Sequence, residues 1–116
     1  MKKMSVTSFN YLHYSSSIRR INSRYKLNEP KQIMVLEAVL SAYKEEKTLS
    51  ISDLLLLKEV ASQATLHAVT KVLIDLKLIK ATVSQSDGRR KYVTPTKLAI
   101  SWMSDCSTAL SITARH

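Results

Sequence analysis

The segment Ser84–Thr96, SQSDGRRKYVTPT, brings together an aspartate, the only glycine of the chain and three basic residues. An Asp-Gly pair favours a tight turn, because glycine adopts positive φ without steric cost. Apolar and β-branched residues on both sides predict a hairpin whose tip carries Asp87, Gly88, Arg89, Arg90 and Lys91. Such a tip either contacts an anion or protects an exposed strand edge from aggregation.

A second group of polar residues lies on a helix predicted to begin at the N-cap Ser62 and to end near Lys77. Its inward stripe consists of Leu66, Val69, Leu73 and Leu76. The first half of the other face carries Gln63, Ala64, Thr65, His67, Ala68, Thr70 and Lys71. Donors among small side chains suit hydrogen bonding at close range, whereas a merely solvated face more often carries glutamate and lysine.

These two groups need a helical scaffold. Residues 4–25 predict one helix with an apolar stripe at 3-4 spacing, formed by Met4, Thr7, Tyr11, Tyr14, Ile18, Ile21 and Tyr25. This stripe either packs on its own domain or forms a seam between two copies of the chain.

Further helices are predicted from capping signals. Asn28 is the expected N-cap of a second helix, whose wide apolar arc places it centrally. Ser50 and Asp53 fit a capping box that opens a short helix from Ile51 to about Lys58, preceded by a β-prone stub at residues 48–50. Thr94 is the expected cap of the last helix, with Pro95 in its first turn and Trp102 and Met103 on its apolar side.

Length and charge limit the classes of protein. A chain of 116 residues with 45% apolar residues predicts a single domain over 1–116. We divide it into an N-terminal interface helix (1–26), a helix-turn-helix plus wing (27–94) and a C-terminal helix (95–116). The net charge of +9 favours an acidic partner, with nucleic acid before an anionic membrane.

Other classes are disfavoured. A single glycine excludes the glycine-rich loops that bind nucleotides, and no spacing of the three histidines suggests a metal site. We therefore expect no enzyme activity, no catalytic residue, no metal and no cofactor. The single cysteine, Cys106, excludes an internal disulfide, and we interpret it as a half-buried structural residue rather than a redox switch. With no signal peptide or membrane span in the sequence, we expect a cytoplasmic protein.

A short helix, a turn, a longer helix and a basic hairpin together predict a mainly α fold of about five helices, the winged helix-turn-helix. The second helix would enter the DNA major groove, and the hairpin would contact phosphates or the adjacent minor groove.

The segments LNEPKQIMVLEAVL, LSISDLLLL, ASQATLHAVTKVLIDLKLIK and SDGRRKYVTPTKLA, in this order, resemble the MarR family of winged-helix regulators over roughly residues 27 to 100. The resemblance implies that Ser62, Gln63, Thr65, His67 and Lys71 face the groove, that Arg89 is the wing arginine and that Asp87 is its partner. Departures are Lys77 in place of a family glycine, a shorter wing and a shorter C-terminus. The shorter C-terminus removes part of the usual pocket wall, which argues against a small-molecule effector.

The expected function is therefore sequence-specific binding of double-stranded DNA by a transcriptional regulator. Its DNA-binding residues are Ser62, Gln63, Ala64, Thr65, His67, Thr70, Lys71, Asp87, Arg89, Arg90 and Lys91. A homodimer is expected through Tyr11, Tyr14, Ile18, Ile21, Trp102 and Met103, because two-fold pairing places two recognition helices one DNA turn apart. The alternatives are a winged-helix module of replication, partition or phage and plasmid maintenance, and an adaptor that binds only protein.

Overall fold

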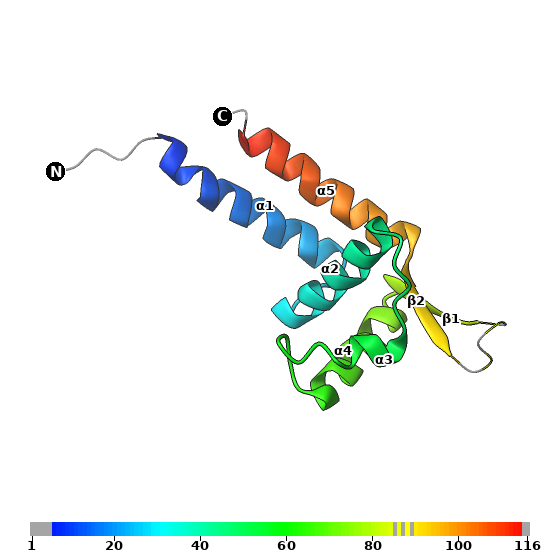
Figure 1. Cartoon of the computed structure of the whole chain (residues 1–116). Helices are drawn as coiled ribbons and strands as arrows, with labels where there is room; N and C mark the ends of the chain where they lie inside the picture. The colour runs from blue at the N-terminus through cyan, green and yellow to red at the C-terminus, as the bar shows by residue number, and fades with distance from the viewer. Residues whose placement is uncertain (1–5, 85, 87, 89, 115–116) are drawn as a thin grey trace.

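A computed structural model describes residues 6–84, 86, 88 and 90–114 of the chain. The N-terminal segment forms a 3-10 turn, η1 (Val6–Phe9), followed by α1 (Asn10–Arg24), where the sequence predicts a single helix over 4–25. The long C-terminal helix α5 (Lys97–Ala114) lies beside α1, and the two helices form an arm that projects from the rest of the molecule (Figure 1).

Helix α2 (Pro30–Lys44) begins one residue later than its predicted cap implies. Proline favours an extended residue before it, so Glu29 rather than Asn28 is the N-cap and Pro30 occupies the first turn. The Oε1 atom of Gln32 accepts the backbone N–H groups of Asn28 (3.1 Å) and Glu29 (3.3 Å). The predicted central position is confirmed, because Val35, Leu36, Val39 and Leu40 are all buried.

The helix-turn-helix consists of α3 (Ile51–Leu54) and α4 (Gln63–Asp75). The predicted capping box is present, since Asp53 N–H donates to Ser50 Oγ (3.0 Å) and Ser50 N–H donates to Asp53 Oδ2 (2.9 Å). The prediction that α3 extends to about Lys58 is wrong. Tighter i→i+3 bonds replace helical ones after Leu54, as in the 3.2 Å bond from Leu57 N–H to Leu54 O.

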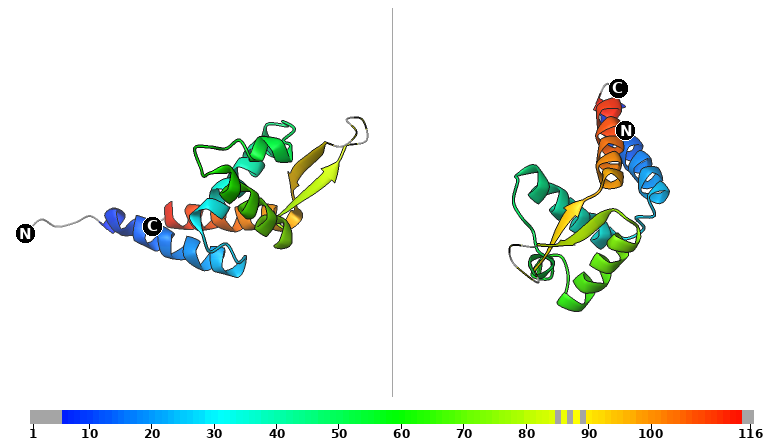
Figure 2. Two further views of the ribbon diagram at one scale, coloured as in Figure 1. Left: turned by 90° about the horizontal axis from the view of Figure 1, so that it is seen from below. Right: turned by 90° about the vertical axis from the view of Figure 1, so that its right-hand side faces the viewer.

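The hairpin joins β1 (Ile79–Val83) and β2 (Lys91–Pro95) as antiparallel strands, with Ile79 opposite Pro95 and Val83 opposite Lys91. The β-prone stub adds a short bridge on the other edge of β2, where Ser50 pairs with Tyr92 and Val93 N–H donates to Leu49 O (2.7 Å). The hairpin therefore packs beside α3 through β2, and its two strands extend away from the helices (Figure 2).

Helix α5 is capped by Thr96, so the prediction of Thr94 as the cap and Pro95 in the first turn is wrong. The Thr96 hydroxyl accepts Ala99 N–H (3.3 Å) and donates to Lys77 O (2.7 Å). Pairing in the hairpin continues through Pro95, which ends the strand where its missing N–H is tolerated.

Three helices end on a non-glycine residue with positive φ: Lys26 (62°), Glu46 (56°) and Lys77 (62°). After Lys77, Leu78 N–H donates to Leu73 O (3.0 Å). This hydrogen bond is typical of a helix C-terminus that is closed by a residue in the left-handed conformation. Glycine usually occupies this position because a side chain strains it. Lys77, which replaces the glycine of the resembled family, therefore keeps the backbone conformation at a cost in stability.

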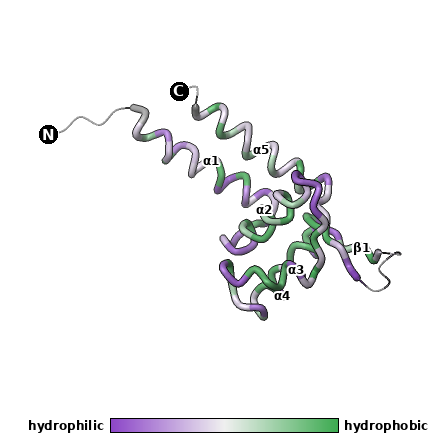
Figure 3. The backbone as a smooth tube through the Cα atoms, viewed as in Figure 1, coloured by the Kyte–Doolittle hydropathy of each residue, from purple (hydrophilic) through white to green (hydrophobic). Residues whose placement is uncertain are grey.

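The core lies where α2, α4, the base of the hairpin and the inner ends of α1 and α5 meet, and the apolar segments concentrate there (Figure 3). Its buried apolar members are Ile21, Leu27, Val35, Leu36, Val39, Leu40, Leu54, Leu66, Val69, Leu73, Leu78, Ile79, Val93, Ala99 and Trp102. The radius of gyration is 16.9 Å, above the roughly 13 Å typical of a compact domain of this length, because the arm projects from this core. Among the described helices, none is long and apolar enough to cross a membrane.

Candidate nucleic-acid interface

The N-terminus of α4 is fixed by two side chains of the predicted interface. Ser62 Oγ accepts Thr65 N–H (3.3 Å), and the Ser62 hydroxyl donates to Thr65 Oγ1 (3.1 Å). The prediction of Ser62 as the N-cap is confirmed. These two hydroxyls are thus held against the helix end, and they lie beside the exposed Gln63 and Ala64.

The outer face of α4 presents Gln63, Ala64, His67 and Lys71 to solvent, together with Ala68. Residues 63, 67 and 71 repeat every four positions, so their side chains follow one another along a single face. The opposite face is fixed to the core by the fully buried Leu66 and Leu73. The exposed face therefore has a defined orientation, which a helix must have to hydrogen-bond a partner specifically.

Thr70 does not belong to this face, so its assignment to the DNA-binding residues is wrong. Its exposed fraction is 5%, because position 70 lies one turn after Leu66 and beside Val69 on the core side of the helix. The Thr70 Oγ1 atom is buried and has no hydrogen-bond partner among the described residues.

Gly88 has a φ of +69°, the positive value expected of a glycine in the hairpin turn. Ser84 N–H donates to Arg90 O (2.9 Å), which closes the turn below Gly88. Arg90 and Lys91 are exposed, as expected. The predicted pair of Asp87 and Arg89 lies outside the described residues.

Asp53, whose sequence pattern predicts only a helix cap, also lies near the wing. The pKa of the Asp53 carboxyl is lowered by its backbone and side-chain hydrogen bonds with Ser50 and further by the positive charge of Arg90. Asp53 therefore stays ionised and attracts a wing arginine. The cap motif is visible in the sequence, but its closeness to Arg90 arises only when the hairpin packs against α3.

The predicted dimer surface divides into a buried part and an exposed part. Ile21 and Trp102 are 6% and 5% exposed and belong to the core of the single chain, so their assignment to the dimer interface is wrong. Their burial follows from the inner halves of α1 and α5 packing on each other. Of the other predicted residues, Tyr14 and Ile18 are half-buried, while Tyr11 and Met103 are exposed.

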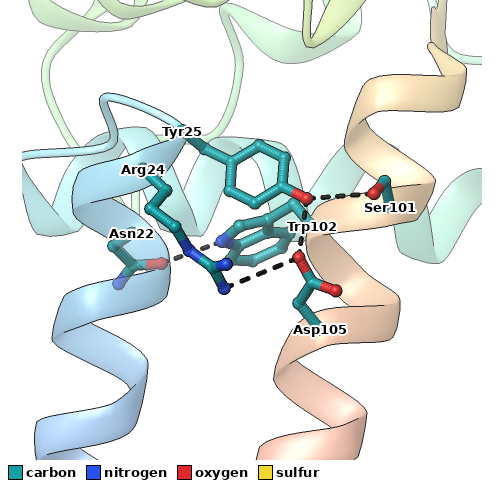
Figure 4. Close-up of polar contacts among 6 residues, drawn as sticks. All are labelled: Asn22, Arg24, Tyr25, Ser101, Trp102 and Asp105. Atoms are coloured by element: carbon teal, nitrogen blue, oxygen red, sulfur yellow. Dashed lines mark hydrogen bonds and ion pairs between the residues drawn. The ribbon is translucent and has the colours of Figure 1, made fainter.

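Polar contacts hold the inner halves of α1 and α5 together (Figure 4). Trp102 Nε1–H donates to Asn22 Oδ1 (2.8 Å) in a buried hydrogen bond. Nearby, the Tyr25 hydroxyl donates to Asp105 Oδ2 (2.7 Å), and the guanidinium of Arg24 lies 3.8 Å from the same oxygen. These contacts fix the two helices of the arm relative to each other.

Cys106 on α5 is half-buried, as predicted. Burial, with smaller contributions from the negative charges of Asp105 and Glu37, raises the pKa of its thiol to about 11. The thiol is thus protonated at neutral pH, which agrees with a structural role. The described residues contain no cluster of three or more His, Cys, Asp or Glu side chains that could hold a metal ion.

No protein-family model matches the sequence, and no curated protein matches it either. Solved structures do match the fold. A mutant of MepR from Staphylococcus aureus bound to an oligodeoxyribonucleotide has a TM-score of 0.73 at 14% identity, over 97% of this chain and 81% of that chain. MepR bound to ethidium bromide has a TM-score of 0.63 at 16% identity, over 97% of this chain and 79% of that chain.

The heme sensor protein PefR, in complex with heme and carbon monoxide, has a TM-score of 0.56 at 23% identity, over 88% of this chain and 68% of that chain. These proteins are MarR-family winged-helix regulators, so the predicted fold is confirmed. Two of the three structures contain a small molecule, ethidium or heme. They give no support to the sequence argument against an effector, which stays a prediction.

Proposed function

We propose that this protein is a transcriptional regulator that binds double-stranded DNA in a sequence-specific manner, with α4 in the major groove. The observation that carries the proposal is the outer face of α4. Its exposed side chains Gln63, His67 and Lys71 are separated by alanines, and the helix sequence contains no acidic residue before Asp75. Duplex DNA is an acidic partner that requires both close approach and hydrogen-bond donors.

Individual roles follow from chemistry and position. Gln63 and His67 have the donors and acceptors that read base edges, and Lys71, one turn further along, is suited to a phosphate. Arg90 and Lys91 extend the positive surface along the hairpin, and Arg89 in the turn is assigned by sequence resemblance. The MepR structure with an oligonucleotide supports the proposal, because a protein of the same fold is named there in complex with DNA.

We also propose that the protein is a homodimer held by its arm. Exposed large apolar side chains gather on η1, α1 and α5 and include Phe9, Tyr11, Leu12, Leu110 and Ile112, which are 45–71% exposed. Apolar surface on a projecting pair of helices favours a second apolar surface as its partner. A two-fold dimer would place two α4 helices about 34 Å apart, one turn of DNA.

Substitutions on α4 test the DNA-binding proposal. Gln63→Ala and His67→Ala should each reduce the preference for a selected duplex over a scrambled one by about 5- to 150-fold, because a base contact contributes about 1–3 kcal/mol of discrimination. His13→Ala, an exposed histidine on α1, is the matched control and should change nothing. Fluorescence anisotropy with both duplexes measures the preference. Equal affinity losses on both duplexes would contradict base reading by α4.

Sedimentation equilibrium tests the dimer. The wild-type protein should sediment near twice its mass of 13.1 kDa at micromolar concentration. Leu110→Asp should give monomers, because it places a charge on the proposed seam. Leu56→Asp changes an equally exposed leucine outside the arm and should leave the dimer intact. A wild-type mass of one chain would contradict the proposal.

A further inference from the structure

A groove of about 920 Å³ runs along the arm between α1 and α5. On α1 its lining residues extend from His13 to Arg24, a length of about 17 Å at the rise of an α-helix. Its floor contains Ile21, which is buried, Ala109, which is half-buried, and Ile112, which is 45% exposed. The groove is therefore elongated, with about three turns of α1 as one wall and an apolar floor.

The α1 wall of this groove is cationic. His13, Arg20 and Arg24 line it at intervals of seven and four residues, which place their side chains on one face of the helix. Arg19 lines the groove as well. The guanidinium of Arg20 donates to Ser17 Oγ (3.3 Å), which also lies on this wall. The positive charges thus follow the groove along its length.

The arm does not neutralise this charge itself. Throughout the described bounds of α1 and α5, Asp105 is the one acidic residue. Its carboxylate already accepts the Tyr25 hydroxyl (2.7 Å) and lies 3.8 Å from the guanidinium of Arg24. Arg19 and Arg20 have no acidic partner among the described residues. The groove therefore presents uncompensated positive charge beside apolar surface, which favours an acidic occupant with an apolar face.

A second copy of the chain does not meet this requirement, because its arm carries the same positive charges. The apolar residues of the proposed dimer also lie largely elsewhere. Tyr11 and Leu110 are each two residues, or about 200° of helix rotation, from the groove residues His13 and Ile112. The dimer seam that Leu110→Asp tests is thus on the other side of the arm, and the groove stays open when that seam is covered.

Duplex DNA does not suit the groove either. Helices that pack side by side lie about 8–10 Å apart, so the floor between them is too narrow for a duplex but within reach of the side chains of a third helix. The arm also projects away from the hairpin (Figure 1). Arginine suits carboxylates, because its guanidinium binds them through paired hydrogen bonds.

We infer that the groove between α1 and α5 is a docking site for an acidic amphipathic helix of a partner protein. The apolar side chains of that helix pack on Ile21, Ala109 and Ile112, and its carboxylates bind Arg19 and Arg20. The inference does not depend on DNA binding, and it leaves α4 free to contact a duplex while the partner is docked.

A synthetic peptide tests the groove in the full-length protein. The probe is a stapled helix of about 15 residues, enough to fill the groove, with leucines on one face and glutamates beside them. Fluorescence anisotropy should show saturable binding to the wild type. Arg20→Glu should weaken it by about 2- to 25-fold, because the change removes one ion pair and adds one repulsion. Lys31→Glu makes the same charge change on α2, outside the groove, and should bind the peptide as the wild type does.

Two further measurements locate the contact. A peptide with lysines in place of the glutamates should bind Arg20→Glu more tightly than the wild type. Thr108→Glu, which adds a negative charge on the α5 wall, should also weaken binding of the glutamate peptide. Unchanged binding in this variant would contradict docking between the two helices.

The other possible occupants give distinct results. A loss of duplex affinity in Arg20→Glu beyond that of Lys31→Glu would assign the groove to DNA, and a mass of one chain for Arg20→Glu in sedimentation equilibrium, with a wild-type dimer, would assign it to the second copy. Either result would overturn the inference. No saturable binding of the glutamate peptide up to about 1 mM would also overturn it, while the proposed DNA binding and dimer would be unaffected.

Discussion

Replacing Thr70 by valine tests the division of α4 into a core face and a DNA face. The Thr70 hydroxyl is buried without a hydrogen-bond partner among the described residues, and the side chain is 5% exposed. Valine has a similar branched shape and places a methyl group where the hydroxyl lies. The substitution therefore removes an unsatisfied polar atom and leaves the packing nearly unchanged.

The size of the effect follows from the burial. An unsatisfied buried hydroxyl costs about 1–3 kcal/mol, so Thr70→Val should raise the free energy of unfolding by roughly this amount. With an unfolding entropy of about 2.1 cal/mol/K per residue, a chain of 116 residues should gain roughly 4–12 °C in melting temperature. Thermal unfolding followed by circular dichroism, at one fixed protein concentration, measures the shift.

A matched variant and a binding measurement complete the test. Thr65→Val removes a hydroxyl of the same helix that Ser62 already hydrogen-bonds, so it should not stabilise the protein. Thr70→Val should bind DNA as the wild type does, because position 70 faces the core. A lower melting temperature of Thr70→Val, or a loss of its DNA affinity, would refute the assignment of the two faces.

Three further predictions concern stability and reactivity. Lys77→Gly should stabilise the protein by about 1 kcal/mol in urea unfolding, since it relieves a positive φ, and no gain would argue against strain there. Asn22→Ala should destabilise by about 1–3 kcal/mol, because it leaves Trp102 Nε1–H buried without its acceptor. Combining it with Trp102→Phe should cost less than the sum of the two, and additive losses would contradict the hydrogen bond. Cys106, whose thiol pKa is raised from 9.0 to about 11, should react with iodoacetamide at pH 8 about 100-fold more slowly than in the unfolded chain.

The sequence predicts best those elements whose signals are local. The hairpin and the Ser50–Asp53 capping box depend on residues within a few positions of one another, and the structure confirms both. Gly88 has the positive φ expected of it. Errors occur where two local signals compete. Thr94 has the pattern of a helix cap, but continued pairing of β2 with β1 keeps it in a strand and moves the cap to Thr96.

The surface on which a side chain lies is less predictable, because helical periodicity locates the edge of a helix face only to within about one residue. Thr70 lies at the edge of the apolar stripe of α4, and its short polar side chain suggested exposure. The apolar stripes that contain Trp102 and Ile21 predict a dimer seam equally well, because such a stripe does not reveal which neighbour covers it. The sequence predicts Asp53 as part of a helix cap, but its closeness to Arg90 depends on tertiary packing, which no spacing in the sequence reveals.

Selection of bound sequences from random duplex DNA tests the central claim most directly. If α4 reads base edges and the protein acts as a dimer, selection should converge on a palindrome whose half-sites are about one helical turn apart. The variant with both Gln63→Ala and His67→Ala should still bind duplex DNA. The sequences that it selects should no longer specify some of the base positions within each half-site. A pool that stays random for the wild-type protein, at a salt concentration where it binds duplex, would contradict sequence-specific recognition by α4.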